Sequence, residues 1–211
     1  MIRLAREDGL WIVTLDRPDK ANALTAGMLG DLAEIVEAAQ DGARALILTG
    51  AGKVFSAGAD LDAVRTGLAT SPLWERLSGA LAALPIVTVA ALNGTVAGGA
   101  MGMALACDLR IAVAGAGAFY PVMRLGFLPQ PSDPVRLAAL VGPSRARMIL
   151  LAGQKIATDE ALAWGLFDRV VPRETLMESA RALVADSLGA SPGHAAALKA
   201  MCGGRAPRAT G

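Results

Sequence analysis

The sequence predicts an α/β fold. Short apolar runs rich in β-branched residues alternate with longer stretches in which apolar residues recur at helical spacing. Strands that alternate with helices in this way are typical of α/β domains. A length of 211 residues suits one domain, and a hydrophobic fraction of 54% is ample for a core.

The first part of the chain predicts two strands followed by a helix. The strands are expected over 2–6 and 10–15, joined at Glu7-Asp8-Gly9, because an Asp-Gly pair favours a hairpin turn. Thr25 is the predicted N-cap of the helix, which ends near Asp41-Gly42. The apolar residues of this helix recur at helical spacing: Met28, Leu32, Ile35, Val36 and Ala39.

The strand and helix patterns recur along the rest of the chain. They predict a strand over 45–49, a helix around 74–84, a strand over 86–92, a helix from 100 and a strand over 109–113. Beyond these come predicted helices over 135–141, 145–151 and 159–166, a short strand over 168–171 and an amphipathic helix over 174–188. Thr158 is the predicted cap of the helix over 159–166.

The charge pattern bears on the class of partner. The formal net charge is +1 without a basic stripe, so nucleic acid is not an expected partner. The chain carries no charge between Arg76 and Asp108, but Pro85 and Asn93 interrupt this stretch. We therefore expect a buried strand and helix there, partly at a subunit interface, and no membrane insertion.

The N-terminus and the cysteines favour a cytoplasmic location. Arg3 and Arg6 interrupt the apolar core that a signal peptide would need. Cys107 falls in a predicted buried helix, where a free thiol behaves as a small hydrophobic group. No metal-ligand spacing is found, and no metal site is expected.

Two glycine-containing turns follow two of the predicted strands. Gly98-Gly99 opens a stretch of helix-forming residues, so the first N–H groups of that helix lack partners and favour an anion or a polarised carbonyl oxygen. The alternative is close packing of a strand against a helix. A second stretch of small residues, Phe55 to Leu61, follows the strand over 45–49. Together the two turns could offer two convergent N–H donors.

Phe55-Ser56-Ala57-Gly58-Ala59-Asp60-Leu61 and the stretch from Asn93 to Ala112 resemble the enoyl-CoA hydratase/isomerase family, also called the crotonase family. The resemblance extends in order through Leu15-Asp16-Arg17-Pro18, Asn22-Ala23-Leu24, 46–50 and 161–171, so most of the chain is covered. It implies a crotonase-type ββα superhelix over 1–190. The segment 191–211 would be a short helix and a flexible tail, a C-terminal helical region shorter than usual in the family.

The resemblance also implies an acyl-coenzyme A site. By motif position, the backbone amides of Ala59 and Gly99 would form an oxyanion hole that binds the thioester carbonyl and stabilises an enolate. Coenzyme A would be part of the substrate, with no separate cofactor. Its contacts are expected at Lys20, Ala21, Ala57, Asp60 and Leu61. Lys53 and Arg65 flank the first turn, where a solvated surface charge is the alternative interpretation.

The acid–base residues of the family are absent. Hydratases of the family carry two glutamates, and the matching positions here are Gly102 and Val122, which cannot carry a proton. Ordinary hydration should be heavily impaired. Asp133 is a candidate for a relocated catalytic carboxylate, and the alternative is that it caps the helix beginning at Pro134. Tyr120 could donate a hydrogen bond in the pocket or belong to the core.

Three functions remain open from the sequence. The first is an enzyme of fatty acid metabolism acting on acyl-CoA thioesters, a lyase or an isomerase with a different proton donor. The second is a catalytically silent acyl-CoA binding or delivery protein, and the third is a degenerate paralogue that serves only as a subunit partner. The resemblance further implies a homo-oligomer, either a trimer or a hexamer.

Overall fold

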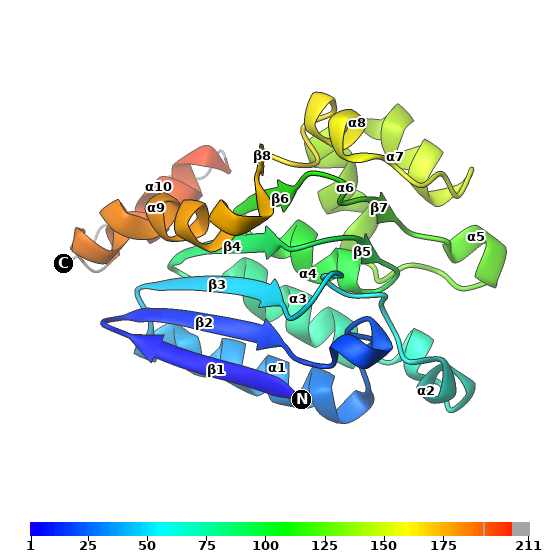
Figure 1. Ribbon diagram of the computed structural model, residues 1–211, viewed down its shortest axis with the longest axis horizontal. Helices are drawn as coiled ribbons and strands as arrows, with labels where there is room; N and C mark the ends of the chain where they lie inside the picture. Colours follow the sequence, from blue (N-terminus) through cyan, green and yellow to red (C-terminus); the bar gives the residue numbers. More distant parts are fainter. Residues whose placement is uncertain (192, 204–211) are drawn as a thin grey trace.

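The computed structural model describes residues 1–191 and 193–203. A six-stranded sheet in the order β1-β2-β3-β4-β6-β8 forms the centre of the molecule (Figure 1). Its strands are β1 (Ile2–Glu7), β2 (Leu10–Leu15), β3 (Ala45–Gly50), β4 (Val87–Leu92), β6 (Leu109–Val113) and β8 (Arg169–Val171). β1 pairs antiparallel with β2, and all the other neighbours in this sheet are parallel. The predicted α/β class is confirmed.

The hairpin between β1 and β2 has the predicted turn. Asp8 and Gly9 have φ values of +44° and +87°. Two successive residues with positive φ match the twist of the flanking strands, and the Asp-Gly pair adopts this conformation readily. The turn sets the register that pairs Glu7 with Leu10.

Helices cover the sheet and continue beyond its last strand. They are α1 (Ala26–Gly42), α2 (Leu61–Arg65), α3 (Leu73–Ala83), α4 (Ala100–Ala106), α5 (Val122–Leu125), α6 (Asp133–Val141), α7 (Pro143–Leu150), α8 (Thr158–Ala163), α9 (Leu176–Gly189) and α10 (His194–Cys202). α1 and α3 pack against each other and lie behind the sheet in Figure 1, whereas α9 packs against β3, β4 and β6. The Thr25 hydroxyl accepts a hydrogen bond from the Met28 amide, which confirms the predicted cap.

A second, shorter ladder runs beside the carboxyl ends of the main strands. β5 (Val96–Ala97) pairs in parallel with β7 (Ala118–Phe119), and Ser56 forms a bridge to Val96. The loops that follow β3, β4 and β6 therefore each contribute one short segment to this ladder. The ladder brings together loops that are separated in the sequence, as in the bridge between Ser56 and Val96.

Short elements are where the sequence-based prediction is incomplete. α2, α5, β5 and β7 contain two to five residues each, too few for an apolar period to be recognised. The predicted cap of α8 is wrong: Thr158 lies inside the helix, Ala157 is the N-cap, and the Thr158 hydroxyl donates to the Ala116 carbonyl. Cys107 is buried as expected, but it directly follows α4.

The uncharged stretch before Asp108 folds as the rest of α3 together with β4, β5 and α4, and most of it is buried. None of the helices in residues 1–191 and 193–203 is long and apolar enough to cross a bilayer. α10 is tied to the core, because the Lys199 ammonium donates to the carbonyls of Leu84 and Ile86. Residues 204–211 of the predicted tail lie outside the described residues, and the proposed boundary at 190 stays a prediction.

A buried arginine joins β6 to the start of β8. The Arg110 side chain is 4% exposed and donates to the carbonyls of Cys107 and Leu166 at 2.7 and 3.0 Å. It also pairs with the Asp168 carboxylate at 3.0 Å. The guanidinium thus satisfies carbonyl groups that cannot reach water.

We predict that Arg110→Met lowers the free energy of unfolding by about 3 kcal/mol, because it leaves buried carbonyls without donors. Urea denaturation measures this change. Arg76→Met is the matched control, since Arg76 pairs with Glu37 where both side chains are more than 40% exposed, and it should cost less than about 1 kcal/mol. Equal losses in the two variants would contradict the role given to Arg110.

Candidate functional site

Two turns touch each other at the carboxyl ends of β3 and β4. Gly58 has a φ of +91°, and a Cβ placed on it would lie 2.8 Å from the Ala97 carbonyl oxygen and 3.4 Å from the Gly99 nitrogen. A residue with a side chain would therefore push the turns apart. The structure confirms that the two predicted turns come together.

Asparagine side chains hold the loop that leads into the first turn. The Asn22 amide donates to the carbonyls of Ala51 and Val54 at 2.9 and 2.7 Å. The Asn93 amide donates to the carbonyls of Gly52 and Val54 at 3.0 and 3.2 Å. Both asparagines are buried. They replace the backbone partners that this irregular loop lacks.

The first turn directs the Ala59 N–H away from its neighbouring chain. Ala59 forms a parallel bridge with Leu24, in which the Leu24 N–H donates to the Gly58 carbonyl and the Asp60 N–H donates to the Leu24 carbonyl. In a parallel ladder the residue between two such bonds points its own N–H to the other side. The Ala59 N–H therefore faces away from Leu24.

The second turn leaves a free N–H at the start of α4. Gly99 is the N-cap of this helix, and the Gly98 N–H before it donates to the Phe119 carbonyl at 3.1 Å. Within the described part of the chain, neither the Gly99 N–H nor the Ala59 N–H donates to another group. The geometry offers two unpaired main-chain donors from touching turns, which is the arrangement an oxyanion site needs.

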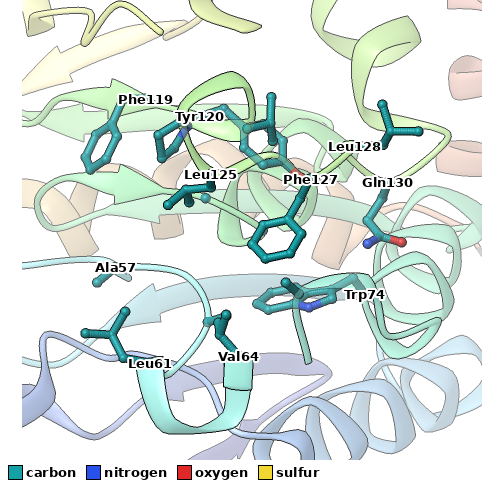
Figure 2. Close-up of a pocket in the computed structure, with 16 residues that line it drawn as sticks. Ala57, Leu61, Val64, Trp74, Phe119, Tyr120, Leu125, Phe127, Leu128 and Gln130 are labelled. Atoms are coloured by element: carbon teal, nitrogen blue, oxygen red, sulfur yellow. The ribbon is translucent and has the colours of Figure 1, made fainter. Parts of the chain in front are cut away.

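An apolar pocket opens on these donors. Figure 2 shows Leu61, Val64 and Trp74 on one side of the pocket and Leu125, Phe127 and Leu128 on the other. Its lining residues are Ala57, Ala59, Leu61, Val64, Ala69, Trp74, Gly98, Gly99, Phe119, Tyr120, Pro121, Val122, Leu125, Phe127, Leu128 and Gln130. An apolar wall with few polar groups is typical of a small-molecule site.

Trp74 determines that residue 99 is a glycine. A Cβ on Gly99 would lie 2.9 Å from the indole ring, which is held by a hydrogen bond from its Nε1 to the Leu68 carbonyl at 2.8 Å. Sequence reasoning placed Trp74 in a helix and missed this role. No local pattern marks it, because the contact joins segments 25 residues apart.

Asp133 does not cap α6. Ser132 is the N-cap, and the fully buried Asp133 carboxylate accepts a hydrogen bond from the Tyr120 hydroxyl at 2.9 Å through Oδ2. The capping interpretation is therefore wrong. Oδ1 has no hydrogen-bond partner among the described residues. Burial raises the pKa of Asp133 to about 6, against the opposing effects of the Tyr120 hydrogen bond and the Arg136 charge.

The Asp133 carboxylate fills the space beside Gly102. A Cβ on Gly102 would lie 2.7 Å from Asp133 Oδ1, so residue 102 can have no side chain while Asp133 is in place. Gly102 and Gly99 are three residues apart and share one face of α4, about 4.5 Å apart along the axis. Val122 lines the pocket at the start of α5. Val122 thus lies at the pocket, and Gly102 lies beside the Asp133 carboxylate.

The residues predicted to bind coenzyme A lie partly at the pocket and partly on the exposed surface. Ala57 and Leu61 line the pocket, and Ala21 lies beside Ala57, whose N–H donates to the Ala21 carbonyl at 2.9 Å. Lys20 ends an exposed 3₁₀ turn (Pro18–Lys20). Their role in binding stays a prediction.

Asp60 is engaged within the protein. Its carboxylate accepts from the amides of Asp62 and Ala63 at the start of α2 and pairs with Arg17 at 2.6 Å. The Arg17 hydrogen bond and the Ala63 amide hold the pKa of Asp60 below its usual value. Asp60 therefore orders the turn, and contact of its carboxylate with coenzyme A stays a prediction.

No group of three or more histidine, cysteine, aspartate or glutamate side chains in the described ranges is placed to hold a metal ion. The donors at this site are main-chain amides, and Tyr120, which bonds Asp133, lines the pocket.

A parallel α/β spiral with open main-chain amides at its strand ends defines a crotonase-type fold. The sequence profile of the enoyl-CoA hydratase/isomerase family matches residues 5–207. The chain therefore belongs to this family, as the sequence motifs predict.

Known relatives agree with this assignment. The chain is 35% identical over 209 residues to a probable enoyl-CoA hydratase of Rhodobacter capsulatus, covering 96% of this chain and 81% of that protein. It is 34% identical to carnitinyl-CoA dehydratase of Escherichia coli, covering 94% and 78%. The solved enoyl-CoA hydratase of Bacillus anthracis matches with a TM-score of 0.88 at 29% identity, covering 96% and 82%.

We predict that Gly102→Ala lowers the free energy of unfolding by about 1–3 kcal/mol, because its methyl group overlaps the Asp133 carboxylate. In an Asp133→Ala background the same change should be neutral or stabilising, since alanine favours a helix over glycine by about 1 kcal/mol. Urea denaturation of the four proteins measures the coupling. Gly30→Ala in α1, where a Cβ meets nothing within 4 Å, should be stabilising. A cost of Gly102→Ala that is the same in both backgrounds would contradict the contact.

Proposed function

We propose that this protein binds an acyl-coenzyme A thioester and stabilises its enolate. The thioester carbonyl oxygen lies between the N–H groups of Ala59 and Gly99. The observation that carries this proposal is that both amides are without acceptors and lie on turns that touch each other. The family membership and the acyl-CoA names of the relatives support the class of ligand.

The two donors are suited to catalysis because they are main-chain groups on rigid turns. A donor fixed in place before charge develops on the oxygen needs no reorganisation, and one such donor is worth about 3 kcal/mol in comparable sites. The Gly99 N–H at the start of α4 also lies at the positive end of a short helix dipole. These features stabilise an oxyanion whichever reaction follows.

Ordinary hydration of a double bond does not fit the side chains. Gly102 and Val122 occupy the positions of the family's glutamates and cannot exchange a proton. A lost acid or base typically costs about 10²–10⁴-fold in rate. The reaction class that fits is lyase or isomerase chemistry through an enolate, with its proton handled by another group. Asp133 is the candidate for the group that transfers this proton.

The coenzyme portion of the ligand is assigned by motif position. Ala21, Ala57 and Leu61 lie where the acyl-pantetheine arm would enter the pocket, and Lys20 offers a cation to the phosphates. Asp60 contributes by ordering the turn before α2. A homo-oligomer and a cytoplasmic location stay predictions.

A catalytically silent acyl-CoA binding protein is the second candidate. It is favoured by the absence of a carboxylate among the pocket-lining residues of the described chain. Turnover of a panel of acyl-CoA thioesters separates the candidates: tight binding without any product favours the binding protein, and product formation that depends on Asp133 favours the enzyme.

We predict that butyryl-CoA binds about 5- to 150-fold more tightly than S-butyl-CoA, a thioether that lacks only the carbonyl oxygen. Two hydrogen bonds at about 0.5–1.5 kcal/mol each account for this range. Calorimetry on the unmodified protein measures both affinities, so no variant has to fold. Free coenzyme A is the control for contacts outside the acyl group. Equal affinity for thioester and thioether would show that the two amides do not bind the carbonyl.

A further inference from the structure

We propose that Tyr120 is the proton-transferring group of the pocket and that Asp133, enclosed behind it, is the carboxylate that takes up and returns the proton. This inference rests on the thioester binding proposed above and adds the residues that act on the substrate carbon. Tyr120 would be the catalytic residue that touches the substrate, and Asp133 would act through it.

The short ladder places Tyr120 at the oxyanion turn. β7 pairs with β5 so that Phe119 lies opposite Ala97, and the Gly98 N–H donates to the Phe119 carbonyl. Tyr120 is the next residue after this pair and lines the pocket that contains Gly99. Its position is thus determined by the same backbone pairing that positions Gly99.

Asp133 is connected to the pocket wall through Tyr120. The aspartate is fully buried and is not a lining residue, whereas Tyr120 lines the pocket and donates to Asp133 Oδ2 at 2.9 Å. Asp133 Oδ1 has no partner in the described residues. A buried carboxylate with an unused oxygen is costly, and it calls for an explanation other than stability.

The carboxylate also lies where position 102 lacks one. Asp133 Oδ1 would be 2.7 Å from a Cβ on Gly102. Gly102 follows Gly99 by one helical turn on the same face of α4. The carboxylate that α4 lacks at position 102 is thus supplied by Asp133, the first residue of α6.

Few charges surround Asp133. On α6 itself, Arg136 Nη1 lies 4.0 Å from Oδ1 and also donates to Ser78. From α3, Glu75 accepts a hydrogen bond from the Ser132 N–H at 3.3 Å and opposes ionisation of Asp133. α4 has no charged or titratable residue. Burial outweighs the Arg136 charge, so the pKa of Asp133 is raised to about 6, and burial likewise raises the pKa of Tyr120.

The proposed step removes a proton from the α-carbon of the thioester. The Tyr120 oxygen takes this proton while the tyrosine's own proton passes to Asp133 Oδ2. The electron pair of the C–H bond moves into the enolate, and the negative charge lies on the oxygen held by Ala59 and Gly99. The reverse transfer returns a proton from Asp133 through Tyr120 to carbon.

Exchange of the α-hydrogens of butyryl-CoA in deuterium oxide tests this step, because it needs an enolate but no net reaction. We expect the wild-type protein to catalyse exchange, followed by NMR. Tyr120→Phe and Asp133→Asn should each slow it at least about 100-fold while the affinity for butyryl-CoA changes less than about threefold. Asp108→Asn is the control, because that carboxylate bonds Thr88 and Lys199 at the opposite ends of β4 and β6, and exchange should persist.

The pH profile separates proton transfer from a structural role. The step needs ionised Asp133, so the wild-type exchange rate should rise with pH up to about 6 and level off above it. The residual rate of Asp133→Asn should lack this rise. The wild-type profile needs no variant to fold, and Tyr120→Phe removes a single oxygen atom.

Three results would overturn the proposal. The first is exchange at the wild-type rate in Tyr120→Phe or Asp133→Asn, and the second is a wild-type rate that does not change between pH 5 and 7. The third is no exchange by the wild-type protein when thioester still binds more tightly than thioether, which would leave the proposed binding function standing. Equal binding of thioester and thioether would refute the binding function as well.

Discussion

The site depends on the contact between two turns that have almost no side chains. Gly58 lies so close to Ala97 and Gly99 that any Cβ there would separate them, and Trp74 leaves no space for a side chain on Gly99. Asn22 and Asn93 hold the loop that leads into the first turn, and the ladder of β5 and β7 holds the second turn. Packing is thus used to expose backbone amides, and a side-chain substitution cannot remove a main-chain donor.

The second feature of the site is that one residue occupies the space that the side chain of another would fill. In most cores a missing side chain leaves a cavity or is filled by an apolar neighbour. Here the absent side chain of Gly102 is replaced by the carboxylate of Asp133, which is fully buried and held by Tyr120. Burying a carboxylate costs stability unless it is well paired. Its presence beside the oxyanion turns connects the energetics of the fold with the proposed chemistry.

Much of this arrangement could be predicted from the sequence. The long strands and helices follow their apolar periods, and the Asp8-Gly9 turn and the Thr25 cap follow local chemistry. The family motifs located the turns of Ala59 and Gly99. The contact of Trp74 with Gly99 and of Asp133 with Gly102 joins distant segments, so no local pattern reveals it. Local rules even favoured the wrong role for Asp133, because an aspartate before a proline usually caps a helix.

The central claim is that the Ala59 and Gly99 amides bind one thioester oxygen. A crystal structure of the protein with bound butyryl-CoA tests it most directly. We expect the carbonyl oxygen within about 3 Å of both amide nitrogens, in line with ordinary N–H to oxygen bonds. A carbonyl oxygen that lies away from both nitrogens, with the acyl group in the same pocket, would contradict it.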